Sequence, residues 1–227
     1  MKLLALETAT MFGGVAIMED YTLIAESRAN VKVTHSERVM TEIDHVLRHS
    51  GMTIRDIDVF GISIGPGSFT GLRVGLSTVK GLAFASAAGL VAVPTLESLA
   101  WNVPFTGYQV CPMLDARKKQ VYAALFKWSE DGFVRVMDEC AIAVRDLMPL
   151  IKERTVFLGE GMLLNKETIE RGLGELALFS QPHKAAPSPA NTAYLCMLKA
   201  MRGQFEDAPE LSPLYIRRSE AESKGSE

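Results

Sequence analysis

The sequence predicts an α/β protein of two lobes, in which mixed sheets are flanked by helices. The chain opens with an apolar strand, an acidic residue, a polar turn and a second apolar strand, KLLALETATMFGGVAIMED. Helices and strands then alternate, which is typical of a parallel sheet. The opening layout returns as VCPMLDARKKQVYAALFKW, where Asp115 occupies the place of Glu7. These three observations together indicate an internal duplication.

The first lobe begins with a meander of short apolar runs separated by glycine and polar turns. The predicted strands cover residues 3–6, 14–18 and 22–31. A helix over 34–51 follows, because Thr34 and Glu37 fit a capping box and Gly51 is a suitable C-terminal stop. Between these ends, apolar residues recur at helical spacing.

The rest of the first lobe alternates strand and helix. The unbroken apolar character of DVFGISIG predicts a buried strand over 58–65. This strand enters the glycine-rich loop SIGPGSFTGLRVG, residues 63–75, and then a helix from about 70 to 88. GLVAVP follows as another short strand. Proline and glycine in NVPFTGY interrupt the pattern and mark the lobe boundary.

The duplicated strand–carboxylate–turn–strand unit is the layout of the ribonuclease-H-like fold that sugar kinases, actin and Hsp70 chaperones (ASKHA proteins) share. We therefore expect an N-terminal lobe over 1–104, completed by the C-terminal segment 205–218. A smaller, degenerate second lobe covers 105–204, and 219–227 forms a tail that is disordered by composition. A fold of this kind does not by itself give a function.

Composition narrows the functional classes. The chain has 227 residues and a formal net charge of −3, which argues against a strong grip on a nucleic-acid backbone by this chain alone. The densest basic cluster, Arg117-Lys118-Lys119, is interpreted as a solvated turn. The three cysteines are far apart and form no disulfide or zinc pattern. The N-terminus resembles a strand more than a signal peptide, and no apolar run is long enough for a membrane span. We expect a cytoplasmic protein.

The glycine-rich loop is tested against known phosphate cradles. Gly65 and Gly71 are one residue too far apart for a Walker A loop, and Gly65, Gly67 and Gly71 also fail the spacing of a dinucleotide loop. A helix N-terminus could still hold an anion, or Ser68 or Thr70 could cap the helix. Phosphate binding by this chain alone is therefore the weaker interpretation.

The helix after the loop is apolar on nearly all sides and contains two glycines, Gly75 and Gly81, each costing roughly 1 kcal/mol relative to alanine. Either it lies in the middle of its own domain, or one face packs on the sheet and the other on a partner chain. The pattern alone leaves both interpretations open. His45 and His49 form an H-x-x-x-H pair without a third ligand nearby in sequence, so we predict no metal site. We also find no nucleophile–base arrangement.

Five segments of the sequence resemble the TsaB family, also called YeaZ. They are GISIGPGSFTGLRVGLSTVKGLA, LLALETAT, HSERV, MLDARKKQVY and PLYIR. The resemblance extends from Met1 to about Arg218. It implies the two-lobe actin/Hsp70-like fold and a role in the threonylcarbamoyladenosine modification of tRNA. It also implies pairing with the catalytic paralogue TsaD, a further partner in the ATPase TsaE, and a homodimer when the chain is alone.

The segment VAVPTLESLAW departs from the catalytic paralogue, which carries two metal-binding histidines four residues apart. Thr95 and Leu99 occupy those places, and leucine cannot ligate a metal. We therefore expect a non-catalytic subunit with no catalytic residues and no metal of its own. ATP or ADP and the metal would belong to the complex through TsaD and TsaE, and contact with tRNA would be only indirect.

The resemblance and the helix pattern together predict two sets of site residues. Glu7, Thr8 and Asp115 would line a degenerate nucleotide cleft. A helical bundle with the partner would use residues of both long helices of the first lobe: His35, Val39, Ile43, Val46, Gly71, Val74, Gly75, Thr78 and Leu82. On this basis Gly75→Leu would leave the fold largely intact and abolish pairing.

Two alternatives remain at this point. The first is a stand-alone nucleotide-binding enzyme of the sugar-kinase/actin class, with Glu7 and Asp115 as magnesium-side carboxylates. Against it, such kinases carry aspartate at the first place, and ETAT lacks the glycine that lets phosphate approach. The second is direct tRNA binding through the basic residues Arg117, Lys118, Lys119, Arg217 and Arg218, which the net acidity disfavours.

Overall fold

The structure is a computed structural model, and it describes residues 1–30 and 35–217. The chain divides into two compact units. Unit 1 consists of Met1–Ser98 and Pro187–Pro213, and the described part of unit 2 consists of Leu99–Ala186 and residues 214–217. A short helix, α3 (Thr95–Ala100), contains the first point of division.

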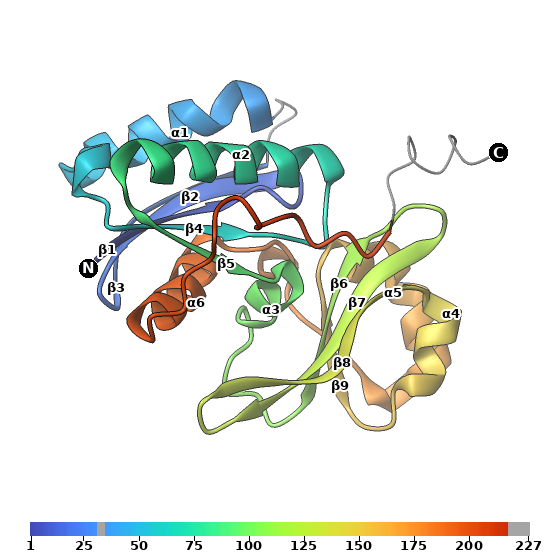
Figure 1. The fold of residues 1–227 in the computed structure, drawn as a ribbon. Coiled ribbons are helices and arrows are strands. Elements are labelled where there is room, and N and C mark those ends of the chain that lie inside the picture. Colours follow the sequence, from blue (N-terminus) through green and yellow to red (C-terminus); the bar gives the residue numbers. More distant parts are fainter. Residues whose placement is uncertain (31–34, 218–227) are drawn as a thin grey trace. The chain divides into compact units, whose positions relative to one another are not determined.

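Unit 1 is built on a five-stranded sheet with the order β3-β2-β1-β4-β5 (Figure 1). Its strands are β1 (Lys2–Glu7), β2 (Phe12–Glu19), β3 (Thr22–Asn30), β4 (Val59–Ser63) and β5 (Gly89–Val93). β1, β2 and β3 form an antiparallel meander, whereas β4 and β5 run parallel to β1. Hence the carboxyl ends of β1, β4 and β5 meet at one edge of the sheet.

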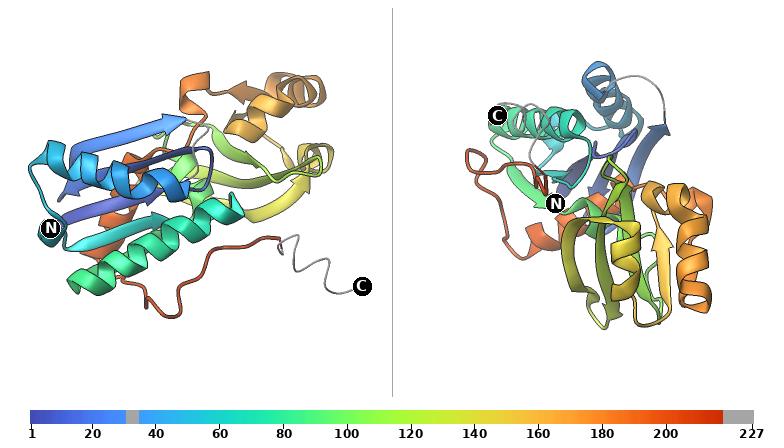
Figure 2. Two further views of the ribbon diagram at one scale, coloured as in Figure 1. Left: turned by 90° about the horizontal axis from the view of Figure 1, so that it is seen from above. Right: turned by 90° about the vertical axis from the view of Figure 1, so that its right-hand side faces the viewer.

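Helices cover both faces of this sheet. Figure 2 shows α1 (His35–Ser50) and α2 (Phe69–Ser86) side by side on one face, with the 3-10 turn η1 (Ile54–Asp56) between them in the chain. The apolar residues of α1 and α2 form one core with alternate residues of β1, β2 and β4. α6 (Pro189–Met201) packs on the opposite face (Figure 1). The predicted capping residue Thr34 lies outside the described residues.

Unit 2 repeats this layout with the sheet order β10-β9-β6-β7-β8. Its strands are β6 (Gln109–Asp115), β7 (Gln120–Ser129), β8 (Gly132–Ala143), β9 (Thr155–Leu158) and β10 (Ala177–Phe179). Its helices are α4 (Val144–Leu147) and α5 (Glu160–Leu173), with 3-10 turns η2 (Met148–Leu150), η3 (Gly174–Leu176) and η4 (Pro182–Lys184). β6, β7 and β8 are antiparallel neighbours, and β9 runs parallel to β6. The duplicated mixed sheets confirm the predicted fold class.

One helix belongs to a different unit from the one we predicted. Residues 105–204 were expected to form the second lobe, but α6 packs on the sheet of unit 1. Two glycines make room for it: a Cβ on Gly61 would lie 2.8 Å from Cys196 Sγ, and one on Gly14 would lie 2.8 Å from the ring of Pro189. Burial of the apolar face of α6 against this sheet decides where the helix lies.

The boundaries also differ in detail from the predicted 1–104 and 205–218. Unit 1 ends its first segment at Ser98, and the C-terminal segment is shared, with unit 1 ending at Pro213 and unit 2 continuing beyond it. The predicted tail, 219–227, lies outside the described residues. Within residues 1–30 and 35–217, no helix is long and apolar enough to cross a membrane.

Candidate functional site

The carboxyl ends of β1 and β4 are where an open α/β sheet usually places a binding site. Glu7 is the last residue of β1, and Ser63 is the last residue of β4. The turn over residues 8–11, which we call the first turn, joins β1 to β2, and the glycine-rich loop joins β4 to α2. The first turn and this loop therefore form the candidate site of unit 1.

The glycines of the loop are explained by close approach to the first turn. A Cβ on Gly67 would lie 2.5 Å from the carbonyl oxygen of Ala9, and the amide of Ser68 donates to the same oxygen at 2.7 Å. The amide of Gly65 donates to the hydroxyl of Thr95 at 3.0 Å, and the amide of Thr95 donates to the carbonyl oxygen of Gly65 at 2.8 Å. A phosphate cradle would leave the backbone amides of the loop free to bind the anion. Here the amides of Gly65 and Ser68 instead donate to other groups of unit 1. Ser68 is the N-cap, and its hydroxyl accepts from the amide of Gly71 at 3.3 Å.

Glu7 is completely buried, and its carboxylate is held by unit 1 itself. Oε1 accepts from the amide of Ala9 at 2.8 Å, and Oε2 accepts from the Thr192 hydroxyl at 3.3 Å. The Thr192 hydroxyl also lies 2.8 Å from that of Ser98. Burial raises the pKa of Glu7 from 4.5 to about 7, although the hydrogen bonds from Ala9 and Thr192 oppose the shift. The carboxylate therefore exchanges a proton near neutral pH.

Thr8 is also buried, with 2% of its surface exposed. Its hydroxyl faces Gly75 of α2, and it has no hydrogen-bond partner in the described part of the chain. The buried Glu7 and Thr8 side chains offer no surface to a nucleotide, so the structure does not support the predicted cofactor-binding role for these two residues. A magnesium-side carboxylate would have to be accessible.

Asp115, the third predicted cofactor-binding residue, belongs to unit 2. It is the last residue of β6 and is 23% exposed. Its Oδ1 accepts from the amide of Arg117 at 2.8 Å, and its Oδ2 lies 3.2 Å from the guanidinium of the same residue. Burial raises the pKa of the neighbouring Glu160, although the amide of Asp115 donates to that carboxylate and opposes the shift. The nucleotide-binding role of Asp115 stays a prediction.

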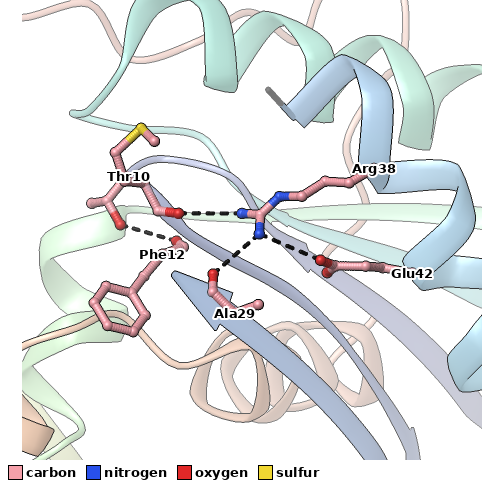
Figure 3. A network of polar contacts seen from close by, with 6 residues as sticks. Thr10, Phe12, Ala29, Arg38 and Glu42 are labelled. Carbon is pink, nitrogen blue, oxygen red and sulfur yellow. Dashed lines mark hydrogen bonds and ion pairs between the residues drawn. The ribbon is translucent and has the colours of Figure 1, made fainter. Parts of the chain in front are cut away.

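Arg38, in the HSERV segment, is a buried cation that the sequence analysis missed. Figure 3 shows its guanidinium between the first turn, the end of β3 and α1. It donates to the carbonyl oxygens of Ala29 at 3.1 Å and Met11 at 3.2 Å, and it lies 3.4 Å from the carboxylate of Glu42. The carboxylate four residues further along the helix was the available signal. Arg38 thereby fixes α1 to the first turn, where Thr10 closes a further hydrogen bond to the Phe12 carbonyl oxygen at 3.0 Å.

Most of the predicted partner-interface residues are buried within this chain, so in this chain alone they present little surface to a partner. Their apolar faces pack on the sheet, and Gly75 approaches Thr8 and Ile62. The buried residues are Val39, Ile43, Val46, Gly71 and Gly75. Val74, Thr78 and Leu82 are half-buried and stay candidates. His35 begins α1, and its side chain lies outside the described residues.

The outer side of α2 is exposed. We call it the α2 face and define it by the residues Thr70, Arg73, Ser77, Gly81 and Phe84. The Phe84 side chain is 91% exposed, and nothing lies within 4 Å of a Cβ placed on Gly81. The Arg73 guanidinium lies 3.8 Å from the centroid of the Phe69 ring. Sequence reasoning missed Gly81 and Phe84 as surface residues, because a helix that is apolar all round does not show which side meets its sheet.

The structure also locates the residues that were considered for metal binding. The rings of His45 and His49 lie 4.3 Å apart between centroids on the exposed side of α1. Thr95 and Leu99 are fully buried. Within residues 1–30 and 35–217, no group of three or more histidine, cysteine or acidic side chains could hold a metal ion.

Comparison with known proteins assigns the chain to a group of relatives. The family model described as TsaD, tRNA N6-adenosine threonylcarbamoyltransferase, matches residues 24–224. The Bacillus subtilis "tRNA threonylcarbamoyladenosine biosynthesis protein TsaB" is 31% identical over 99% of this chain and 97% of its own length. The Haemophilus influenzae protein of the same name is 26% identical, over 96% and 94% respectively.

Solved structures agree on the fold. YeaZ from Pseudomonas aeruginosa superposes with a TM-score of 0.80 at 24% identity, covering 94% of this chain and 99% of that one. A ROK hexokinase from Thermus thermophilus, at 9% identity, gives a TM-score of 0.51 and coverages of 89% and 100%. At these identities the likeness concerns the fold alone.

Proposed function

The chain belongs to the TsaB (YeaZ) family and takes part in threonylcarbamoyladenosine biosynthesis on tRNA, and from this premise we propose that it is a non-catalytic subunit. Its proposed partners are a TsaD-type catalytic paralogue and a TsaE-type ATPase, in the cytoplasm. ATP or ADP and the metal would be bound through those partners. In their absence, two copies of this chain would form a homodimer.

The exposed α2 face is the observation that carries the pairing proposal. The Phe84 side chain is 91% exposed on this face, and aromatic side chains are enriched at the centres of protein interfaces. Gly81 beside it has no side chain and open space above it, so a second helix can approach closely. A paralogue of the same fold would present its own equivalent helix. Two copies of one chain would meet there by a two-fold axis.

The non-catalytic part of the proposal is supported by the buried residues at the predicted catalytic and metal-binding places. Glu7 is buried and engaged by Ala9 and Thr192, so it is not placed to hold magnesium or to accept a substrate proton. Thr95 bonds to Gly65, and Leu99 carries no ligand atom. These observations disfavour the alternative of a stand-alone nucleotide-binding enzyme. ATP turnover by the purified chain that Asp115→Asn abolishes would restore that alternative.

Light-scattering mass of the 24.8 kDa chain, alone and mixed with the TsaD-type paralogue, tests the pairing. We expect a homodimer that converts to a one-to-one heterodimer. Gly81→Leu and Phe84→Asp should both abolish pairing. Gly81→Leu should do so without loss of fold, because leucine favours the helix over glycine by about 1 kcal/mol.

Leu164→Asp is the matched control, since this leucine is 69% exposed on α5 in unit 2. It should leave both masses unchanged. If Phe84→Asp and Gly81→Leu pair as well as the control does, the interface lies on another surface and the proposal fails.

A further inference from the structure

The turn between β6 and β7 has an unusual backbone. It consists of Ala116, Arg117, Lys118 and Lys119, and we call it the basic turn. The amide of Ala116 donates to the carbonyl oxygen of Gln120 at 3.0 Å. The amide of Gln120 donates to the carbonyl oxygen of Arg117, also at 3.0 Å. The φ angles of Arg117, Lys118 and Lys119 are +59°, +50° and +60°. Three successive residues thus adopt the left-handed conformation.

The residue types in the basic turn conflict with this conformation. Two central residues with positive φ are typical of a type I′ hairpin turn, for which Asn-Gly is the preferred pair. The hairpin of β2 and β3 has a single non-glycine residue of this kind, Asp20 with a φ of +50°, and at the start of β8 the positive φ of +126° falls on Gly132. At the basic turn it instead places three long cationic side chains where each costs conformational energy. Residues that break a local rule in this way are expected at functional sites.

The charges of the basic turn face solvent. Arg117, Lys118 and Lys119 are all exposed, and Arg117 is ion-paired to Asp115 at 3.2 Å. A fourth cation lies beside them, because the guanidinium of Arg217 donates to the carbonyl oxygen of Ala116 at 2.7 Å. The turn therefore gathers cations on the surface of a chain whose net charge is −3. Arg218, which the sequence analysis grouped with these residues, lies outside the described part of the chain.

We propose that the basic turn contacts the phosphate backbone of RNA, with Lys118 and Lys119 as the phosphate-binding residues and Arg217 holding the turn. This inference rests on the proposed function, which gives the chain a tRNA substrate complex to work in. It goes beyond the expectation that this chain meets tRNA only indirectly. Lysine side chains bind backbone phosphates without reading sequence, so the turn would add affinity and leave specificity to the partner.

The test replaces both lysines with the pair that the backbone prefers, Lys118→Asn with Lys119→Gly. The control double variant, Lys152→Asn with Lys184→Asn, removes two exposed lysines of unit 2 that lie outside the turn. Fluorescence anisotropy measures the affinity for a tRNA transcript at several salt concentrations. Each protein is measured alone and with the TsaD-type paralogue, and light scattering and thermal unfolding are recorded on the same samples.

We expect the turn variant to unfold about 2–4 °C higher, because the strain is relieved. Its tRNA affinity should fall roughly fivefold, and the slope of log affinity against log salt should decrease by about two, one per lost phosphate contact. The control should change neither. Unchanged tRNA affinity in the turn variant would overturn the proposal, as would an equal loss in the control. Weaker pairing with the paralogue at unchanged tRNA affinity would assign the turn to a protein surface instead.

Light scattering separates this result from the proposed function. Suppose that the wild-type chain pairs normally with the paralogue and that the turn variant binds tRNA as tightly as the wild type does. In that case the proposed RNA contact is rejected, and the proposed function stands. If pairing fails, the measurements on the chain alone still decide the role of the turn.

Discussion

The two units begin with the same hairpin and use it in opposite ways. In unit 1 the hairpin of β1 and β2 ends its first strand with Glu7, which is fully buried and bonded to Ala9 and Thr192. In unit 2 the hairpin of β6 and β7 ends its first strand with Asp115, which is partly exposed and paired with Arg117. The carboxylate of Glu7 is therefore hydrogen-bonded inside its unit, whereas the carboxylate of Asp115 is paired with an exposed cation.

The difference shows how a duplicated scaffold can diverge without a change of topology. The first turn accepts hydrogen bonds from Ser68 of the glycine-rich loop and from Arg38 of α1, and its polar groups are therefore bonded within unit 1. The basic turn has φ angles that glycine would favour and side chains that are cationic and exposed. Thus the same place at the end of a strand holds a carboxylate engaged by Thr192 of α6 in unit 1 and a carboxylate paired with an exposed arginine of its own turn in unit 2.

The largest expected effect comes from filling the space behind the first turn. In Gly75→Leu a side chain would collide with the Thr8 hydroxyl and with Ile62, whose Cδ1 lies 2.8 Å from a Cβ at this position. Overpacking of this kind should lower the free energy of unfolding by about 3 kcal/mol or more. Urea denaturation measures it. This reverses the earlier expectation that the variant leaves the fold intact.

Gly81→Leu is the matched control for that substitution, because it introduces the same side chain into the same helix on the open side. It should keep or slightly raise the free energy of unfolding. If both glycines tolerate leucine equally well, the enclosed packing of the first turn is contradicted.

The next effect is a pH dependence of stability that the buried carboxylate of Glu7 should cause. The folded-state pKa of Glu7, about 7, lies above the ordinary value of 4.5, so the folded chain binds more protons than the unfolded chain between these values. The free energy of unfolding should therefore fall as pH rises from 4.5 to 7. The expected loss is about 2–3 kcal/mol. Glu7→Gln cannot ionise, so its stability should match the wild type near pH 4.5 and exceed it by about that amount at pH 8.

Chemical denaturation at a series of pH values gives this comparison directly. Parallel profiles for the wild type and Glu7→Gln would mean that Glu7 ionises at its ordinary pKa, and the enclosed environment of the first turn would be disproved.

The smallest effect is expected for the outward carboxylate. Asp115→Asn keeps an acceptor for the amide of Arg117 and loses an ion pair whose arginine is 86% exposed. Exposed pairs contribute little, so the free energy of unfolding should change by less than about 1 kcal/mol. A change as large as that of Glu7→Gln would remove the contrast between the two hairpins.

The sequence predicted much of the fold, since apolar runs, a glycine stop and the repeated strand–turn–strand layout are local signals. It did not predict that α6 joins unit 1, because the choice of sheet depends on Gly14 and Gly61 making room far away in the chain. The pattern of α2 likewise did not separate Gly75 from Gly81. One is enclosed and the other open, and only the packing of the helix on its sheet reveals which.

The candidate site was predicted in part. Glu7 and Asp115 were identified from their matching places in the two strand–turn–strand copies, but the burial of Glu7 and Thr8 was not visible in the sequence. Arg38 was missed because an arginine beside an apolar helix face is usually solvated. Its role depends on the carbonyl oxygens of Met11 and Ala29, which belong to other elements.

The division of unit 1 into two chain segments has a consequence for synthesis on the ribosome. α6 covers one face of the sheet of unit 1, yet its residues are translated only after the 88-residue segment Leu99–Ala186. Until then the nascent chain exposes the apolar surface around Gly61, where Cys196 later packs. We therefore expect the continuous segment of unit 2 to reach its native structure before unit 1 does, and the uncovered sheet of unit 1 to be the most aggregation-prone surface of the nascent chain.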